Sequence, residues 1–417
     1  MNSSKSPSLD RIVSLDQFRG YTVLGMFVVN FVGGFAAAHW LLKHHNTFCS
    51  YADTIMPQFF FAVGFFFRLT MVRRTLTLGS AAAIRRVVHR IGGLLLISLV
   101  IYTVGRPADT WQELVDLGFW GAIQGPLKCE WFQTLTHIAV TSLWVLPVIR
   151  ASATTRVAFL LGSAATHVVL SHWFYFAWVN NGNPNGIDGG PLGFLTWTIP
   201  VIAGSLCVDP YLNGGGRLRA GPVLRWAVLL MVLGYLLSCG TRFYDVAPEL
   251  RETQGATLPK LAAHPVIPPA ESVQRAWSDF RGGDWRRLFC EPPFVPPPHP
   301  PGDIGASPQY RQWNYWMMSQ QAGTLSYQVF ATGFSLAVLW GAYLVCDRWG
   351  RSWALLTTLG TNALAGYILH LMVANALHRF MPPDVPAWYM WGGCGLFLLN
   401  TWLFVRALQR SGIYIRI

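Results

Sequence analysis

Charged residues are scarce in this sequence: Asp, Glu, Lys and Arg make up 12% of its 417 residues, about half of what a soluble domain carries. Hydrophobic residues make up 52%. This composition excludes an ordinary water-soluble domain, because too few charged side chains remain to cover its surface. The apolar residues instead fall in blocks of roughly 20, the length that a helix needs to cross about 30 Å of hydrocarbon. We therefore expect an integral membrane protein in contact with the lipid bilayer.

Three further absences narrow the function. The seven cysteines form no CxxC pair and no metal-like spacing with histidine, so we expect no metal, although one or two disulfides on an oxidising face stay open. The N-terminus lacks a short apolar core followed by a small-residue cleavage site, so we expect no cleaved signal peptide. The net charge is +12, but the arginines lie mainly at helix ends, so we expect no nucleic-acid partner.

The apolar blocks predict an all-α, polytopic membrane helical bundle of about ten transmembrane helices. We place them at residues 19–40, 52–73, 87–105, 130–149, 155–178, 193–209, 221–240, 325–346, 353–376 and 386–407. Helices 1 to 7 then occupy residues 1–240, an extracytoplasmic Pro-rich loop occupies 241–324, and helices 8 to 10 occupy 325–417. No internal repeat is evident, which weakens a transporter built from inverted repeats.

The arginines predict the orientation of the bundle, because positively charged connections resist translocation. They cluster between the second and third helices and recur at every other connection: Arg68, Arg73, Arg74, Arg85, Arg86 and Arg90; Arg150 and Arg156; Arg217, Arg219 and Arg225; Arg348 and Arg351; Arg406, Arg410 and Arg416. We expect these connections and both termini in the cytoplasm of a cell whose inner membrane holds the chain. The outer face then holds 41–51, 106–129, 179–192, 241–324 and 377–385.

The long outer loop is unusual in composition. Its stretch PPFVPPPHPP at 292–301 predicts extended polyproline structure, because proline fixes φ and lacks a backbone donor. Several tryptophans in the loop predict that it packs over the bundle. A role as a lid or partner surface and an insertion without a role in chemistry both stay open.

Ionisable groups at membrane depth are costly and therefore mark candidate sites. The first group is Asn30, His39, His44, His45 and Asp53. A histidine at a water-accessible mouth can accept and release protons near neutral pH, and a nearby carboxylate can orient it. On spacing alone, a solvated loop is the favoured explanation of the His pair, and for Asp53 a role as helix cap competes equally with a catalytic role.

Three later groups follow. Gln133 and His137 lie four residues apart in WFQTLTHIAV and share a helix face. The segment IDGGPLGFLTWTIP at 187–200 brings a Gly-rich turn into a helix, where backbone can approach a ligand. LGTNALAGYILH holds Asn362, Tyr367 and His370. Helix packing is the alternative explanation for the first and third of these groups, and a tight loop without a ligand is the alternative for the segment 187–200.

In this order the segments resemble the heparan-α-glucosaminide N-acetyltransferase family and its bacterial homologues in the transmembrane acyltransferase superfamily. LDQFRG, FVVNFVGG and YADTIMPQFFFAVG look like the family's opening motifs, and FQTLTHIA, GGPLGFLTWTIP and LGTNALAGYIL look like its later ones. The resemblance implies transfer of an acetyl group from cytoplasmic acetyl-CoA to an amine or hydroxyl of an outer sugar or glycan. It implies a catalytic His44, with Asn30 also important, and leaves His45 and, more distantly, His39 as alternatives.

We assign Asp53 to orient the histidine, and Gln133, His137, Asn362 and Arg68 to binding of substrate or CoA, whose phosphates need positive charge. The active histidine would lie on the extracytoplasmic side. A transporter or flippase of a small solute or glycan precursor, and a scaffold whose outer loop binds a partner, are the rival functions. The sequence leaves a homo-oligomer open.

Overall fold

A computed structural model describes residues 12–181, 184–214, 218–247, 249–250, 253, 259–297 and 311–415. Within these residues the chain is helical and forms no β-structure beyond two isolated bridges. The helices are α1 Val13–Val32, α2 Tyr51–Leu78, α3 Ser80–Ile101, α4 Trp111–Gly125, α5 Thr134–Val145, α6 Ala153–Trp173, α7 Tyr175–Asn180, α8 Phe194–Asn213, α9 Ala220–Ser238, α11 Ala270–Arg281, α12 Leu325–Tyr343, α13 Ala354–Thr361, α14 Ala363–His378 and α15 Ala387–Arg410. Short helical turns join them, including η1 Trp40–Leu42, η3 Gly190–Leu192, η4 Cys239–Tyr244 and η6 Trp285–Leu288.

The helices form a bundle with candidate membrane spans. Among the described residues, five helices are long and apolar enough to cross a bilayer, or up to six if α13 and α14 count as one bent span. These properties support a membrane helical bundle. Each of the ten predicted segments contains a helix, but several of these helices do not meet the criteria of length and apolarity, so ten crossings stay a prediction.

Several helix boundaries differ from the predicted ones; the predicted helix 155–178, for example, is divided at Phe174 into α6 and α7. The first helix ends at Val32 rather than near residue 40, because Gly33 and Gly34 lead into a turn. The ninth predicted helix is broken at Asn362, where α13 and α14 meet at 98°. The predicted connection 106–129 contains α4, whose first turn is capped by Thr110 and Glu113.

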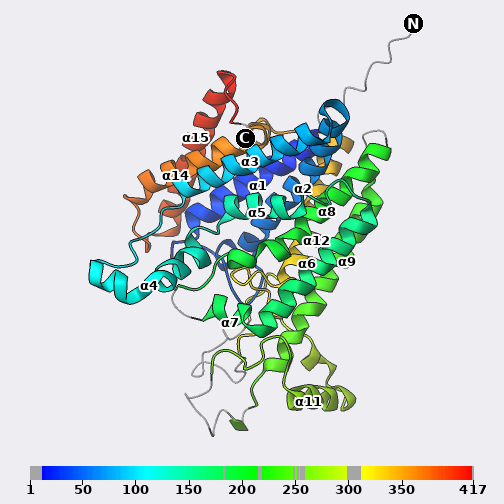
Figure 1. Ribbon diagram of the computed structural model, residues 1–417, viewed down its shortest axis with the longest axis vertical. Coiled ribbons are helices and arrows are strands. Elements are labelled where there is room, and N and C mark those ends of the chain that lie inside the picture. The colour runs from blue at the N-terminus through cyan, green and yellow to red at the C-terminus, as the bar shows by residue number, and fades with distance from the viewer. Residues whose placement is uncertain are drawn as a thin grey trace.

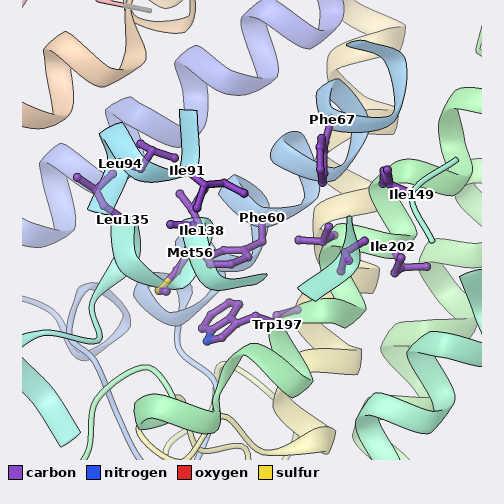
Figure 2. Close-up of a cluster of buried hydrophobic side chains, with 14 of the residues drawn as sticks. Met56, Phe60, Phe67, Ile91, Leu94, Leu135, Ile138, Ile149, Trp197 and Ile202 are labelled. Carbon is purple, nitrogen blue, oxygen red and sulfur yellow. The ribbon is translucent and has the colours of Figure 1, made fainter. Parts of the chain in front are cut away.

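Helix α2 runs through the middle of the core (Figure 1) and packs closely against α8. Figure 2 shows Phe60 and Phe67 from α2 together with Trp197 and Ile202 from α8. The Phe60 and Trp197 rings stack with centroids 4.5 Å apart. A Cβ atom added at Gly64 would overlap the backbone of Val201, and one at Gly204 would overlap that of Phe61. The two helices therefore touch backbone to backbone through reciprocal glycines.

Part of the described loop packs on the bundle, whereas Trp277 and Trp285, two of the tryptophans behind that prediction, are each 54% exposed. Tyr315 is fully buried, and its hydroxyl lies 2.8 Å from Nδ1 of His167 in α6. The expected polyproline structure is wrong at Phe294, whose φ of 69° marks a turn; residues 298–301 lie outside the described residues. Figure 1 shows α7 and α11 at one end of the bundle and the α2–α3 junction at the other.

Candidate active site

The first turn of α2 builds a histidine–carboxylate pair. Ser50 is the N-cap residue, its side chain accepts a hydrogen bond from the Asp53 backbone amide, and Oδ2 of Asp53 accepts one from the Ser50 amide at 2.9 Å. The other oxygen of the same carboxylate, Oδ1, lies 2.8 Å from Nδ1 of His44. Asp53 therefore caps the helix with one oxygen and holds His44 with the other, so the two roles considered for it are compatible.

His44 is held at the edge of the core with its ring partly open. Asp53 is 1% exposed, whereas the His44 side chain is 48% exposed. The carboxylate can only accept, so Nδ1 donates and Nε2 is the nitrogen left for a ligand. The surrounding protein atoms alone would lower the pKa of His44, but the hydrogen bond and charge of Asp53, with the charge of Asp188, raise it above the usual value.

His44 lines a cavity of about 350 Å³ between α1, the start of α2, the end of α3, the start of α5, α14 and the loops that carry His44, Asp188 and Gln320. This volume falls within the range of small-molecule sites. Apolar residues such as Met26, Ile55 and Met56 supply part of its surface. Its polar lining consists of Asn30, His44, Tyr102, Thr103, Gln133, Thr134, Asp188, Gln320, Gln321, Tyr367 and His370.

Asn30, from α1, faces the same cavity as His44. Its Nδ2 lies 3.5 Å from Nε2 of His370, while Nδ1 of His370 lies 2.5 Å from the carbonyl oxygen of Tyr367. Because that carbonyl can only accept, Nδ1 of His370 carries the proton and Nε2 accepts from Asn30. One hydrogen of the Asn30 amide is thereby engaged, and the second is available to a ligand oxygen.

Asp188 is a second carboxylate in the cavity lining, and no role for it was predicted from the sequence. It is 4% exposed, Oδ1 accepts from Nε2 of Gln320 at 2.7 Å, and its carbonyl accepts from the Trp197 indole at 2.7 Å. Its φ is 55°, a conformation that aspartate tolerates better than most residues. Burial raises the pKa of Asp188 to about 7, despite the opposing effects of His44 and Gln320. The clue in the sequence is the acid within IDGG.

Tyr102 and Tyr367 form a hydroxyl pair in the cavity lining. Their oxygens lie 2.7 Å apart, and the Leu135 amide donates to the Tyr102 oxygen at 3.0 Å. Gln321 comes from the long loop, and its buried Oε1 has no hydrogen-bond partner. Tyr102 lies in the predicted third helix, 87–105, and the two glutamines lie in the predicted outer loop 241–324; no motif marked any of the three.

Two of the histidine alternatives lie outside this cavity lining. Nε2 of His45 lies 2.9 Å from the Trp40 carbonyl, and its ring stacks on Phe48 at 4.4 Å. Nδ1 of His39 accepts from the Leu41 amide at the start of η1. His44 is thus the member of the predicted group that combines a carboxylate partner with the cavity.

The predicted binding residues differ in whether they line the cavity. Gln133 lines the cavity. His137 is fully buried with no hydrogen-bond partner at either ring nitrogen, beside Phe132 and Trp197, and is not in the lining. Asn362, at the break between α13 and α14, donates to the Ile413 carbonyl and accepts from the Ile415 amide, so it ties down the C-terminal segment.

Arg68 lies away from the cavity, in an ionic cluster. Its Nε and Nη2 donate to Oδ1 of Asp209 at 3.1 and 2.9 Å, and Nη1 donates to the Ile149 carbonyl at 2.6 Å. Arg156, which is fully buried, binds the other oxygen of Asp209. Arg68 therefore joins α2 to α8, and its donors are directed into the protein.

The chain matches no protein-family model and no curated protein. The described residues contain no group of three or more His, Cys, Asp or Glu side chains arranged to hold a metal ion.

The side chains around His44 can serve a polar reaction. An imidazole oriented by a carboxylate, an amide donor and a second acid surround one small cavity, and together they provide a base and a hydrogen-bond donor.

Proposed function

We propose that the protein is a membrane acyltransferase that moves an acetyl group from cytoplasmic acetyl-CoA to an amine or hydroxyl of a sugar or glycan on the outer side. In this proposal the chain crosses the inner membrane ten times, with both termini inside. The observation that carries it is the His44–Asp53 pair on a cavity that Asn30 also lines. The resemblance of the sequence segments to the acetyltransferase family supports the same reaction.

The step requires one proton acceptor and one oxyanion donor. Nε2 of His44 removes the proton from the acceptor amine or hydroxyl as its nitrogen or oxygen attacks the thioester carbonyl. The Asn30 amide donates to the oxygen that becomes negative. When the tetrahedral intermediate collapses, the C–S bond breaks and the imidazolium returns the proton to the departing thiolate. Asp53 stabilises the imidazolium in between.

The acceptor's own charge fits this cavity. An aminosugar carries an ammonium group. Asp188 is a buried carboxylate that lies close enough to His44 for the charge of the histidine to lower the pKa of the acid. Because the pKa of Asp188 is about 7, the acid can hold a cationic amine near neutral pH and accept a proton from it. We assign Asp188 to positioning an amine acceptor.

The test is acetyl transfer in sealed membrane vesicles with acetyl-labelled acetyl-CoA and glucosamine as the probe acceptor. His44→Ala should lower the rate by about 10²–10⁴-fold, the usual contribution of a general base. His45→Ala is the matched control and should keep the rate, because His45 is engaged with Trp40 and lies outside the lining. Equal rates in wild type and the His44 variant would contradict the proposal.

A transporter of a small solute is the second candidate, favoured by the 98° break between α13 and α14. Broken helices beside a polar cavity are a common arrangement in transporters. Uptake of labelled glucosamine into vesicles without acetyl-CoA, unaffected by His44→Ala, would support transport over acyl transfer.

A further inference from the structure

Two cysteine thiols meet at the junction between the bundle and the long loop. Cys239 begins η4 directly after α9, and Cys290 follows η6, 51 residues later in the chain. Their Sγ atoms lie 3.8 Å apart, and both residues are buried. The seven cysteines all lie within the described residues, and no other pair of them is in sulfur–sulfur contact.

The backbones around these thiols are fixed by contacts that do not involve sulfur. The Tyr235 hydroxyl donates to the Cys290 carbonyl at 2.9 Å, and Nε of Arg242 donates to the Arg287 carbonyl at 3.0 Å. A disulfide needs a sulfur separation of about 2.05 Å. Since the two segments are already held side by side, rotation of the cysteine side chains between staggered positions can close the remaining gap.

We propose that Cys239 and Cys290 are joined by a disulfide bond in the mature protein. Each thiol loses one proton and one electron, and a new S–S bond forms. The two electrons and two protons pass to an extracytoplasmic thiol–disulfide oxidoreductase, whose own disulfide is reduced to two thiols. The inference requires the predicted sidedness, which places residues 241–324 in an oxidising compartment, and it is independent of acyl transfer.

The bond has a consequence for the candidate active site. Shortly after Cys290, the Phe294 amide donates to the Cys49 carbonyl at 2.9 Å. Cys49 directly precedes Ser50, the N-cap that places Asp53. In between, Glu291 pairs with Arg311 at 3.2 Å. The disulfide therefore anchors a short segment, residues 290–294, that packs against the start of α2.

The lysines of the chain allow a direct test. Lys260 is the only lysine between the two cysteines, and the chain has three others, Lys5, Lys43 and Lys128. Complete cleavage after lysine therefore separates fragment 129–260, which contains Cys239, from fragment 261–417, which contains Cys290. The full-length protein is blocked with N-ethylmaleimide in intact membranes, extracted without reductant, digested in denaturant and separated on a gel with and without dithiothreitol.

The expected result is one band holding both fragments without dithiothreitol and two bands with it, together with a linked Cys239–Cys290 peptide in the mass spectrum. Cys239→Ser and Cys290→Ser should each release the fragments, whereas the control Cys394→Ser should not. Recovery of both cysteines as maleimide adducts from wild-type membranes would overturn the proposal. So would a link that appears only after copper–phenanthroline is added, since that shows proximity alone. The wild-type result decides the matter even if a serine variant fails to fold, and acetyl transfer is measured separately.

Discussion

Two carboxylates of this protein are bonded in different ways: Asp53 is buried, whereas Asp209 is 29% exposed. Asp209 lies between the guanidinium groups of Arg68 and Arg156, which also donate to Ile149 and Ser205. Apart from Nε of Arg156, the hydrogen-bonding groups of this cluster are turned toward one another or the backbone. Asp53 instead pairs with a single imidazole whose second nitrogen is free for a ligand in the cavity.

The difference distinguishes an ion cluster that stabilises the fold from the pair that we propose to be reactive. Removing the charge of Asp209 leaves two cations without their counter-ion, which costs folding free energy. Removing the charge of Asp53 leaves a neutral imidazole that is stable by itself but loses its fixed orientation.

Asp209→Asn should reduce the free energy of unfolding by about 3–5 kcal/mol, because it leaves the buried Arg156 and the nearby Arg68 without a negative charge. The measurement is thermal unfolding of the purified protein in detergent. Asp279→Asn is the control, since its pair with the exposed Arg287 should contribute at most about 1 kcal/mol. Equal melting temperatures for the two variants would show that the Asp209 cluster is not structural.

Asp53→Asn should lower acetyl transfer by about 100-fold while the protein remains folded. The amide keeps an oxygen that can cap α2, but it no longer stabilises the imidazolium of His44. Because Asp53 raises the pKa of His44, its loss should also move the acidic limb of the pH–rate profile to lower pH. A profile with an unchanged acidic limb would argue against His44 as the titrating base.

Asp188→Asn should give a smaller shift in the same direction, because Asp188 contributes less than Asp53 to the raised pKa of His44. As pH rises through about 7, wild-type Asp188 ionises and begins to attract a cationic acceptor. The variant should therefore lose affinity for an amine acceptor mainly above pH 7, seen as a higher KM for glucosamine. Equal KM values for both proteins at pH 8 would remove Asp188 from acceptor binding.

His137→Leu should change the unfolding free energy by less than about 1 kcal/mol and leave acetyl transfer intact. An imidazole buried without partners gains nothing from its nitrogens, and an apolar side chain of similar size avoids their desolvation. Thermal unfolding and the vesicle assay measure both quantities. Loss of transfer in a stably folded variant would show that His137 acts on substrate, as its sequence position first suggested.

Much of the fold followed from composition and periodicity. Every predicted apolar segment contains a helix, because 20 consecutive apolar residues satisfy their backbone groups best as a helix. The break at Asn362 could not be predicted, since it depends on hydrogen bonds to Ile413 and Ile415, 51 and 53 residues away. Helix α4 was missed although Thr110 and Glu113 carry the spacing of a capping box, because the segment is short and contains Gly118 in a left-handed conformation.

The candidate site was predictable only where its parts lie close together in sequence. His44 and Asp53 are nine residues apart, and the helix start between them brings them together. The placement of Asp188 and Gln320 beside them depends on two loops that meet through tertiary contacts 132 residues apart in sequence. Gln133 and His137 were both assigned to binding because they share a helix face, but the structure separates them: Gln133 lines the cavity, whereas His137 is fully buried outside its lining.

The reciprocal glycine contact between α2 and α8 determines which parts of the cavity can move. Gly64 and Gly204 interlock the two backbones, so α2 and α8 behave as one rigid body. Asp53 stands on α2, and Asp188 is tied to α8 through Trp197. We therefore expect the two acids to keep their separation when a ligand enters. The movement that admits the ligand should come from α1 or α14, which line the cavity outside this contact.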